Sequence, residues 1–235
     1  MPWPKNHKAN IREKIVSAAS AAVRARGASR VGVEEVMASA GLTHGAFYAH
    51  FSSKDALVRA ALEYAGNQTL ERFSRLLEGV PPDERFNATV AAYLSSQHAA
   101  HPEAGCPVAA LGPEVARTGG RTKRVLAEGI RRRLEWMRSL LPERLYGPRE
   151  DEVVVGALAC MVGAVVLARI LGGEKSEAIL KSTLKFLERA LATKERSPAP
   201  DEPIDRAHQN SPLRMGQRRE DDAPRPHRSR ALSLS

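Results

Sequence analysis

Two groups of side chains in this 235-residue chain have types and spacings that could do chemistry. The first group holds one thiol and two imidazoles, those of Cys106, His98 and His101. Such side chains can bind zinc or copper, and a cysteine beside a histidine can act as a nucleophile. Structural zinc normally has four protein ligands, and neither an oxyanion stabiliser nor a nucleotide-binding motif is recognisable. We therefore expect no metal, no cofactor and no catalytic residues, with a thiol-dependent enzyme that uses Cys106 as the distant alternative.

The second group lies in residues 33–51, where an apolar segment, a glycine and a polar segment follow one another. This order is typical of a helix-turn-helix, in which a glycine makes the sharp turn and a capped second helix enters the major groove of DNA. We expect a short helix over 33–40, a turn at Gly41 and a second helix over 43–51 that begins at Thr43 as its N-cap.

The run 41–57 reads Gly-Leu-Thr-His-Gly-Ala-Phe-Tyr-Ala-His-Phe-Ser-Ser-Lys-Asp-Ala-Leu. It resembles the signature Gly-Val-Ser-x-Gly-x-Leu-Tyr-x-His-Phe-x-x-Lys-x-x-Leu of TetR-family (tetracycline-repressor-like) regulators, and with the helix before it the resemblance spans about residues 10–60. It implies a homodimeric transcriptional repressor that releases palindromic operator DNA when a small molecule enters its C-terminal part. A DNA-binding protein without any effector is the alternative.

Physical position and the resemblance together place a set of side chains against DNA. The start of the second helix would favour a phosphate and bring its side chains to the groove edges. His44 is the sharpest candidate for reading a base, with a solvated surface histidine as the alternative. Lys54 resembles the family's lysine that contacts the DNA backbone. The predicted DNA-binding residues are Arg30, Thr43, His44, Gly45, Ala46, Tyr48, His50 and Lys54.

The composition agrees with a polyanionic partner. The formal charge is +9, and residues 1–60 hold nine Lys/Arg against four Asp/Glu, a net +5. Nucleic acid is the first expected partner and an anionic membrane surface the second. Two cysteines without C-x-x-C spacing and a start that lacks a signal peptide favour the reducing cytoplasm. The apolar stretch 153–168 is short for a bilayer span, so we expect a buried helix and no membrane.

Helical periodicity runs through residues 10–194, so we expect an all-α fold. A basic arm over 1–9 would precede a three-helix DNA-binding domain over 10–55. Lys5 and Lys8 in the arm, like Arg30, could add phosphate contacts, with a solvated charge as the default interpretation of each. Its first helix would begin at a capping box of Asn10 and Glu13, and the helix after the motif at one of Ser52 and Asp55. A larger effector-binding and dimerisation domain would follow over 56–194, with a disordered tail over 195–235. The expected later helices lie at about 83–99, 106–117, 121–141, 149–171 and 175–193.

The segment 105–116 resembles a Gly-Cys-x-x-x-x-Leu-x-x-Glu stretch found in a branch of the same family that includes sensors of electrophiles. Cys106 stands at the expected start of a helix, where the helix dipole favours a reactive thiolate. We therefore take Cys106 as a candidate effector-sensing residue. An inert, half-buried cysteine is the alternative.

Two apolar helix faces near the C-terminus could join two copies of the chain. Gly156, Cys160 and Gly163 form a small-residue face that permits close helix approach. The resemblance implies that the last two helices form a four-helix dimer interface, and an internal core helix is the alternative. The final helix adds a leucine face, made of Leu180, Leu184, Leu187 and Leu191.

Overall fold

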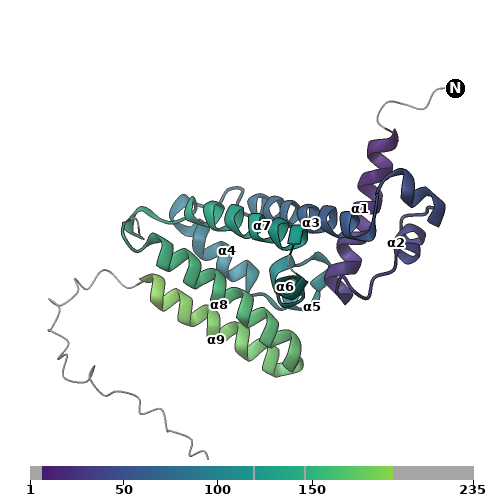
Figure 1. The fold of residues 1–235 in the computed structure, drawn as a ribbon. Coiled ribbons are helices and arrows are strands. Elements are labelled where there is room, and N and C mark those ends of the chain that lie inside the picture. The colour runs from purple at the N-terminus through teal and green to yellow at the C-terminus, as the bar shows by residue number, and fades with distance from the viewer. Residues whose placement is uncertain (1–6, 119, 146, 193–235) are drawn as a thin grey trace, which may run out of the picture. The chain divides into compact units, whose positions relative to one another are not determined.

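The computed structural model describes residues 7–118, 120–145 and 147–192, and every regular element in these ranges is helical (Figure 1). The predicted all-α fold is confirmed. The α-helices are α1 His7–Arg26, α2 Val33–Ser39, α3 Lys54–Leu76, α4 Arg85–Tyr93, α5 Ser96–Ala100, α6 Pro107–Thr118, α7 Gly120–Arg138, α8 Glu150–Leu171 and α9 Gly173–Ala192. Short 3-10 turns are η1 His44–Ala49, η2 Pro82–Glu84, η3 Pro102–Ala104 and η4 Glu143–Leu145.

The start of α1 differs from the prediction. Since α1 already begins at His7, Asn10 lies inside the helix and the proposed capping box with Glu13 is wrong. Lys8 and Ala9 are good helix formers, so nothing in this segment ends the helix at Asn10. The predicted arm is described only from His7 onward, and Lys5 and the tail over 195–235 lie outside the described residues.

Two further caps shift by a residue or lose their side-chain bond. The N-cap of α3 is Ser53 rather than Ser52, and its hydroxyl accepts a hydrogen bond from the backbone N–H of Ala56 at 3.1 Å. Thr43 does occupy the N-cap position before the second element of the motif, but its side chain makes no capping bond. That element, η1, is a 3-10 turn and not the expected α-helix, as befits a short segment with a glycine near its start.

The predicted helix over 83–99 is also divided. Ser95 interrupts it with an extended backbone and caps α5 by accepting a hydrogen bond from the backbone N–H of His98 at 3.2 Å. The four later helices agree with their predicted ranges to within a few residues.

The helix-turn-helix packs on a small apolar core. Its buried side chains come from α1, α2, η1 and α3, and include Ile15, Met37, Phe47, Leu57 and Ala61. The same cluster contains Leu111 and Val115 of α6 and Leu126 of α7. The core of the helix-turn-helix therefore crosses the boundary predicted at residue 55, and that boundary stays a prediction.

A second core joins the remaining helices. The largest buried side chains in it include Phe73, Phe86, Tyr93, Met137 and Met161. The helices α8 and α9 lie side by side along much of their length (Figure 1).

Among the described residues, α8 is the one helix long and apolar enough to cross a membrane, judged by length and composition. A core helix passes the same test. Here α8 packs against α4, α5, α6, α7 and α9, and buries Val154, Met161 and Val165 completely.

The cluster shared by α1 and α6 leads to a prediction about stability. Leu111 is 1% exposed, so Leu111→Ala should lower the free energy of unfolding by about 2–5 kcal/mol, measured by urea denaturation. Leu76, which is 48% exposed, is the matched control, and Leu76→Ala should cost less than about 1 kcal/mol. Equal effects of the two substitutions would contradict a shared core.

Candidate functional site

The turn η1 has several exposed side chains and one buried aromatic side chain that packs in the core. Thr43, His44 and Gly45 are exposed, and Tyr48 is 69% exposed. Phe47 is buried beneath them, and its ring meets that of Tyr48 edge-on with 5.2 Å between centroids. The His44 ring meets the Tyr48 ring in the same manner at 5.9 Å. A large aromatic side chain held upright among polar neighbours is suited to contact a partner surface.

Two of the predicted contact residues are less available. Ala46 is half-buried against the core of the motif. His50 is also half-buried, and its Nδ1 is a buried atom without a hydrogen-bond partner. Burial lowers the pKa of His50, and the positive charges of Lys8 and Arg12 lower it further. This lowered pKa disfavours the charged form of the His50 imidazole.

The sequence analysis missed Arg12. Its guanidinium lies 4.9 Å from the centroid of the Phe51 ring, a cation–π contact that holds the arginine against the end of η1. Arg12 and Lys8 stand four residues apart and are both exposed on α1. This i, i+4 spacing of two basic residues was the available signal. They add positive charge beside the residues of η1.

Lys54 contacts the loop between α1 and α2. Its Nζ donates a hydrogen bond to the carbonyl oxygen of Ser29 at 3.0 Å, and both residues are exposed. An ammonium group has three donors, so this bond leaves donors for a phosphate. Lys54 thus has a structural partner as well as its predicted DNA contact. Arg30, also exposed, lies in the same loop.

Helix α6 holds this loop from the other side. The carboxylate of Glu114 accepts hydrogen bonds from the backbone N–H groups of Ala28, at 3.0 Å, and Ser29, at 2.8 Å. Partial burial alone would raise the pKa of Glu114, but the bonds from Ser29 and Ala28 bring it below its usual value. Gly27 has φ +90°, and a Cβ there would lie 2.9 Å from Glu114 Oε2. The left-handed backbone therefore favours glycine at this position.

A buried arginine makes a second contact between α1 and the start of α6. Arg24 is 4% exposed, and its guanidinium donates to the carbonyl oxygen of Gly105 at 2.8 Å and to Gln68 Oε1 at 2.8 Å. Burial lowers the pKa of Arg24 to about 10, with Arg72 lowering it further. The residue before Cys106 is thereby tied to the DNA-binding part.

Cys106 is 1% exposed and precedes the first residue of α6. Its backbone N–H donates to Nε2 of His98 at 3.1 Å, and Nδ1 of His98 lies 2.7 Å from the carbonyl oxygen of Tyr93. These partners fix the tautomer, because Nδ1 must carry the proton when Nε2 accepts. Burial lowers the pKa of His98 to about 4, although the bond to Tyr93 acts the other way.

This geometry bears on the two alternatives that involve the imidazoles. The lone pair of His98 is used by the N–H of Cys106, so His98 offers no free nitrogen as a base or metal ligand. His101 is exposed and its Nδ1 lies 3.0 Å from Glu103 Oε1. Within the part of the chain that the structure describes, no three His, Cys, Asp or Glu side chains are grouped to hold a metal.

A small cavity lies between α3, α6, α7 and α8. Its volume is about 20 Å³, and it is lined by Cys106 and by apolar residues that include Leu62, Val108, Ile130 and Leu158. Two arginines of α7, Arg132 and Arg133, complete the lining.

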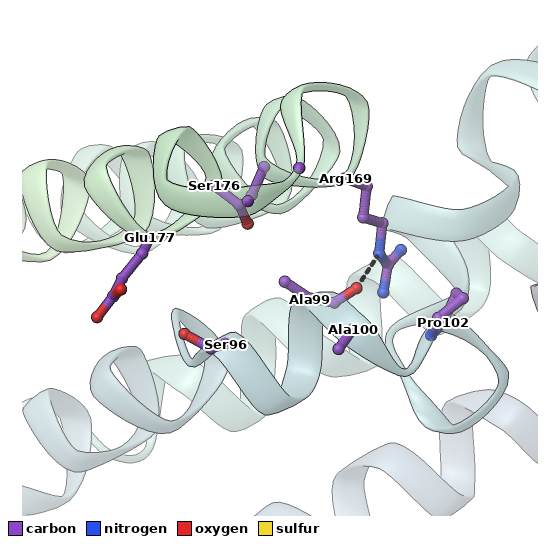
Figure 2. Close-up of a pocket in the computed structure, with 10 residues that line it drawn as sticks. Ser96, Ala99, Ala100, Pro102, Arg169, Ser176 and Glu177 are labelled. Atoms are coloured by element: carbon purple, nitrogen blue, oxygen red, sulfur yellow. Dashed lines mark hydrogen bonds between the residues drawn. The ribbon is translucent and has the colours of Figure 1, made fainter.

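A larger, more open pocket of about 630 Å³ lies between α5 and the turn from α8 to α9 (Figure 2). Ser96 comes from α5, and Ser176 and Glu177 come from α9. Figure 2 shows Arg169 reaching from the end of α8 to the carbonyl oxygen of Ala99, to which its Nε donates at 3.1 Å. Its Nη2 donates to the carbonyl oxygen of His98 at 3.1 Å. The arginine therefore braces α5 against α8 at this pocket.

The leucines of the predicted dimer surface lie largely inside a single chain. Leu180, Leu187 and Leu191 are at most 5% exposed and pack in the core of a single chain, with Leu184 half-buried against it. The amphipathic pattern of α9 reflects this internal packing.

On α8, Gly156 is exposed and Cys160 and Gly163 are half-buried, and a Cβ built on either glycine meets nothing within 4 Å. Leu167 (51% exposed), Ile170 (73%) and Phe186 (60%) leave an apolar surface on α8 and α9. A shallow hollow of about 400 Å³, lined by residues that include Cys160, Gly163 and Phe186, lies in this surface. We call it the α8/α9 face.

The comparisons with known proteins agree with this architecture. Residues 15–61 match the family model for bacterial regulatory proteins of the tetR family. An uncharacterized HTH-type transcriptional regulator of Mycobacterium tuberculosis is 25% identical over 166 residues, which are 68% of this chain and 84% of that protein. The HTH-type regulator YvdT of Bacillus subtilis is 35% identical over 74 residues, 32% of this chain and 37% of that protein.

Solved structures extend the similarity beyond the matched segment. A TetR transcriptional regulator from Chloroflexus aurantiacus aligns with a TM-score of 0.67 and 26% identity, over 80% of this chain and 96% of that one. The reduced form of NemR from E. coli aligns with a TM-score of 0.66 over 77% of this chain and 96% of that one, at 23% identity, which shows the fold alone.

The buried His98 leads to a prediction about pH. Unfolded chains take up a proton at this histidine below about pH 6.5, whereas the folded chain does so only near pH 4. Its contribution to stability is therefore complete above pH 6.5 and is lost as the pH falls toward 4. Between pH 7 and 4.5 the free energy of unfolding should fall by about 2–3 kcal/mol more in the wild type than in His98→Gln.

Urea denaturation at both pH values measures this difference, and NMR titration of the imidazole in the wild type checks the low pKa independently. His101→Gln, at the exposed histidine, should keep the wild-type profile. A His98 titration near pH 6.5 would contradict the buried, neutral imidazole.

Proposed function

We propose, from the premise that this chain belongs to the TetR family of bacterial regulatory proteins, that it represses transcription as a homodimer bound to a palindromic operator, and that a small molecule releases it. The chain is a DNA-binding transcriptional regulator. Repression, the dimer and the effector are the proposal.

The observation that carries the DNA-binding role is the exposed edge of η1. Tyr48 and His44 stand on a turn anchored by the buried Phe47, within the segment that matches the family model. Basic side chains flank this edge, with Lys8 and Arg12 on α1 and Lys54 on α3. Base contacts at the turn would then supply sequence preference, while the basic side chains would hold phosphates.

A contact with a base edge is worth about 1–3 kcal/mol, so His44→Ala should weaken operator binding by roughly 5- to 150-fold. DNase footprinting on DNA around the chain's own gene would locate the site, and fluorescence anisotropy would give Kd. His101→Ala removes an exposed imidazole far along the chain and serves as the matched control. If the His44→Ala protein bound operator DNA and random DNA with the same affinities as the wild type, the assigned role would be contradicted.

The basic residues should act differently. Arg12→Gln should weaken binding to operator and random DNA alike and reduce the slope of log K against log salt by about 1. Lys123→Gln, at an exposed lysine of α7, is the control and should leave the slope unchanged. An unchanged slope in Arg12→Gln would exclude a phosphate contact.

Homodimerisation would use the α8/α9 face. Its exposed apolar side chains and the small residues beside them suit close packing of two helix pairs, and a dimer would place two copies of η1 on successive major grooves about 34–36 Å apart.

Leu167→Glu should convert dimers to monomers in size-exclusion chromatography with light scattering and weaken operator binding. Leu76→Glu is the matched control, because Leu76 is 48% exposed and Leu167 51%. A Leu167→Glu protein that stays dimeric would move the interface elsewhere.

The effector would act through α6. This helix lines the small cavity at its start and holds the loop between α1 and α2 through Glu114. A ligand that displaces α6 would therefore shift the DNA-binding part. Cys106 is buried and His98 is not available as its base, so the proposal rests on ligand binding beside the thiol and not on an electrophile that reacts with it.

A further inference from the structure

An unusual concentration of positive charge surrounds Cys106. Four arginines contribute to it, namely Arg24, Arg72, Arg133 and Arg169, each of which interacts electrostatically with Tyr93, His98 or Cys106. Among the described residues, none of the four forms an ion pair with an acidic side chain. Glu103 interacts electrostatically with Arg24 and Arg169, but its carboxylate contacts the exposed His101. No acidic side chain that the structure describes therefore neutralises the cluster through an ion pair.

Three of these guanidinium groups bond to backbone or amide oxygens. Arg24 donates to Gly105 and Gln68, Arg169 donates to Ala99 and His98, and Arg72 donates to the carbonyl oxygen of Ala104 at 2.9 Å. Such bonds satisfy the N–H groups but leave the positive charge in place.

Arg133 differs from the other three. It is 5% exposed, and its Nη1 is buried without a hydrogen-bond partner. Its guanidinium makes a cation–π contact with Phe73, 5.6 Å from the ring centroid. A buried charge without a partner is costly. Arg133 lines the small cavity beside Cys106, and Nε of its neighbour Arg132 is also unpartnered. The unpartnered N–H donors of Arg132 and Arg133 on the α7 side of the cavity favour an anion.

The other walls favour an apolar body. Leu62, Val108, Leu126, Ile130 and Leu158 line the same cavity. Tyr93 lies near the cluster with its hydroxyl buried beside Cys106, and burial raises the pKa of Tyr93 well above its usual value, but Tyr93 does not line this cavity.

We propose that this cavity binds a small organic carboxylate, with the carboxylate paired to the guanidinium of Arg133 and the hydrocarbon part packed between α6 and α7. Binding itself is a property of the cavity, and its regulatory meaning rests on the function proposed above.

The size of the cavity determines how such a ligand would act. About 20 Å³ holds a single water molecule, so a carboxylate with even a few carbons must separate α6 from α7 or α8. Leu111 of α6 packs in the core of the helix-turn-helix, and Glu114 of α6 bonds to the loop between α1 and α2. The separation would therefore also displace the helix-turn-helix.

The test compares acids with neutral molecules of the same shape. Hexanoate and benzoate are titrated against hexanamide and benzamide, with sodium sulfate as a purely inorganic anion, and binding to the full chain is measured by calorimetry and by the unfolding temperature. We expect both carboxylates to bind and to raise the unfolding temperature, and the amides and sulfate to bind at least about tenfold more weakly.

The decisive variant is Arg133→Met, which keeps the hydrocarbon length and removes the charge. It should lose carboxylate binding by at least about tenfold, and in the absence of ligand it should unfold at the same or a higher temperature than the wild type, because it removes an unpaired buried charge. Arg131→Met is the matched control on the same helix, since Arg131 is exposed and paired with Glu128. A merely structural Arg133 would instead lower the unfolding temperature.

Several results would overturn the proposal: equal binding of amides and carboxylates, equal effects of sulfate and hexanoate, or carboxylate binding that Arg133→Met preserves. Should Arg133→Met fail to fold, Arg133→Gln is measured in its place. Operator binding is measured separately, so carboxylates that bind without releasing DNA would refute the effector role and leave the anion site standing. Intact, specific operator binding without any carboxylate binding would refute the anion site alone.

Discussion

The carboxylate of Glu114 holds the loop between α1 and α2, and the relation between the two parts of the molecule depends on it. Two backbone N–H groups donate to one side chain, which gives the loop a fixed position relative to α6. Charge-assisted bonds to backbone groups are among the stronger hydrogen bonds in proteins. From the other side, Lys54 fixes the carbonyl oxygen of the same Ser29. The loop is thus held between the helix that follows η1 and a helix that lines the cavity.

This arrangement makes α6 the shared element of two cores. Its first turn meets the positively charged cluster, and its later residues Leu111 and Val115 belong to the core of the helix-turn-helix. Arg24 strengthens the link by bonding to the residue before Cys106. A single helix that two packed cores restrain can respond to only a few discrete displacements, because close-packed interiors deform little. Under the proposed function, a ligand that displaces α6 would shift the helix-turn-helix through this packing, without a hinge.

Local features could be predicted from the sequence, and long-range ones could not. The turn at Gly41, with φ +72°, and the buried Phe47 follow from residue types within a few positions. The contact between Glu114 and Ser29 joins residues 85 apart and leaves no local pattern. The leucines of α9 show the same limit, since an apolar face does not say whether its partner is the same chain or a second copy. Arg133 lies in the run Arg131-Arg132-Arg133, and a run of like charges gives no sign of which member points inward.

The packing of Leu111 and Val115 in the core of the helix-turn-helix has a consequence for any exchange of parts of this chain with another protein. The segment over 7–60 is not a self-sufficient module, because part of its apolar interior is supplied from α6. A recombination that joined residues 7–60 to a different C-terminal part would leave the inner face of α1 without the α6 side chains that pack with it. A transfer of α1, α2 and α3 from this chain to another protein would have to include α6 to keep that core intact.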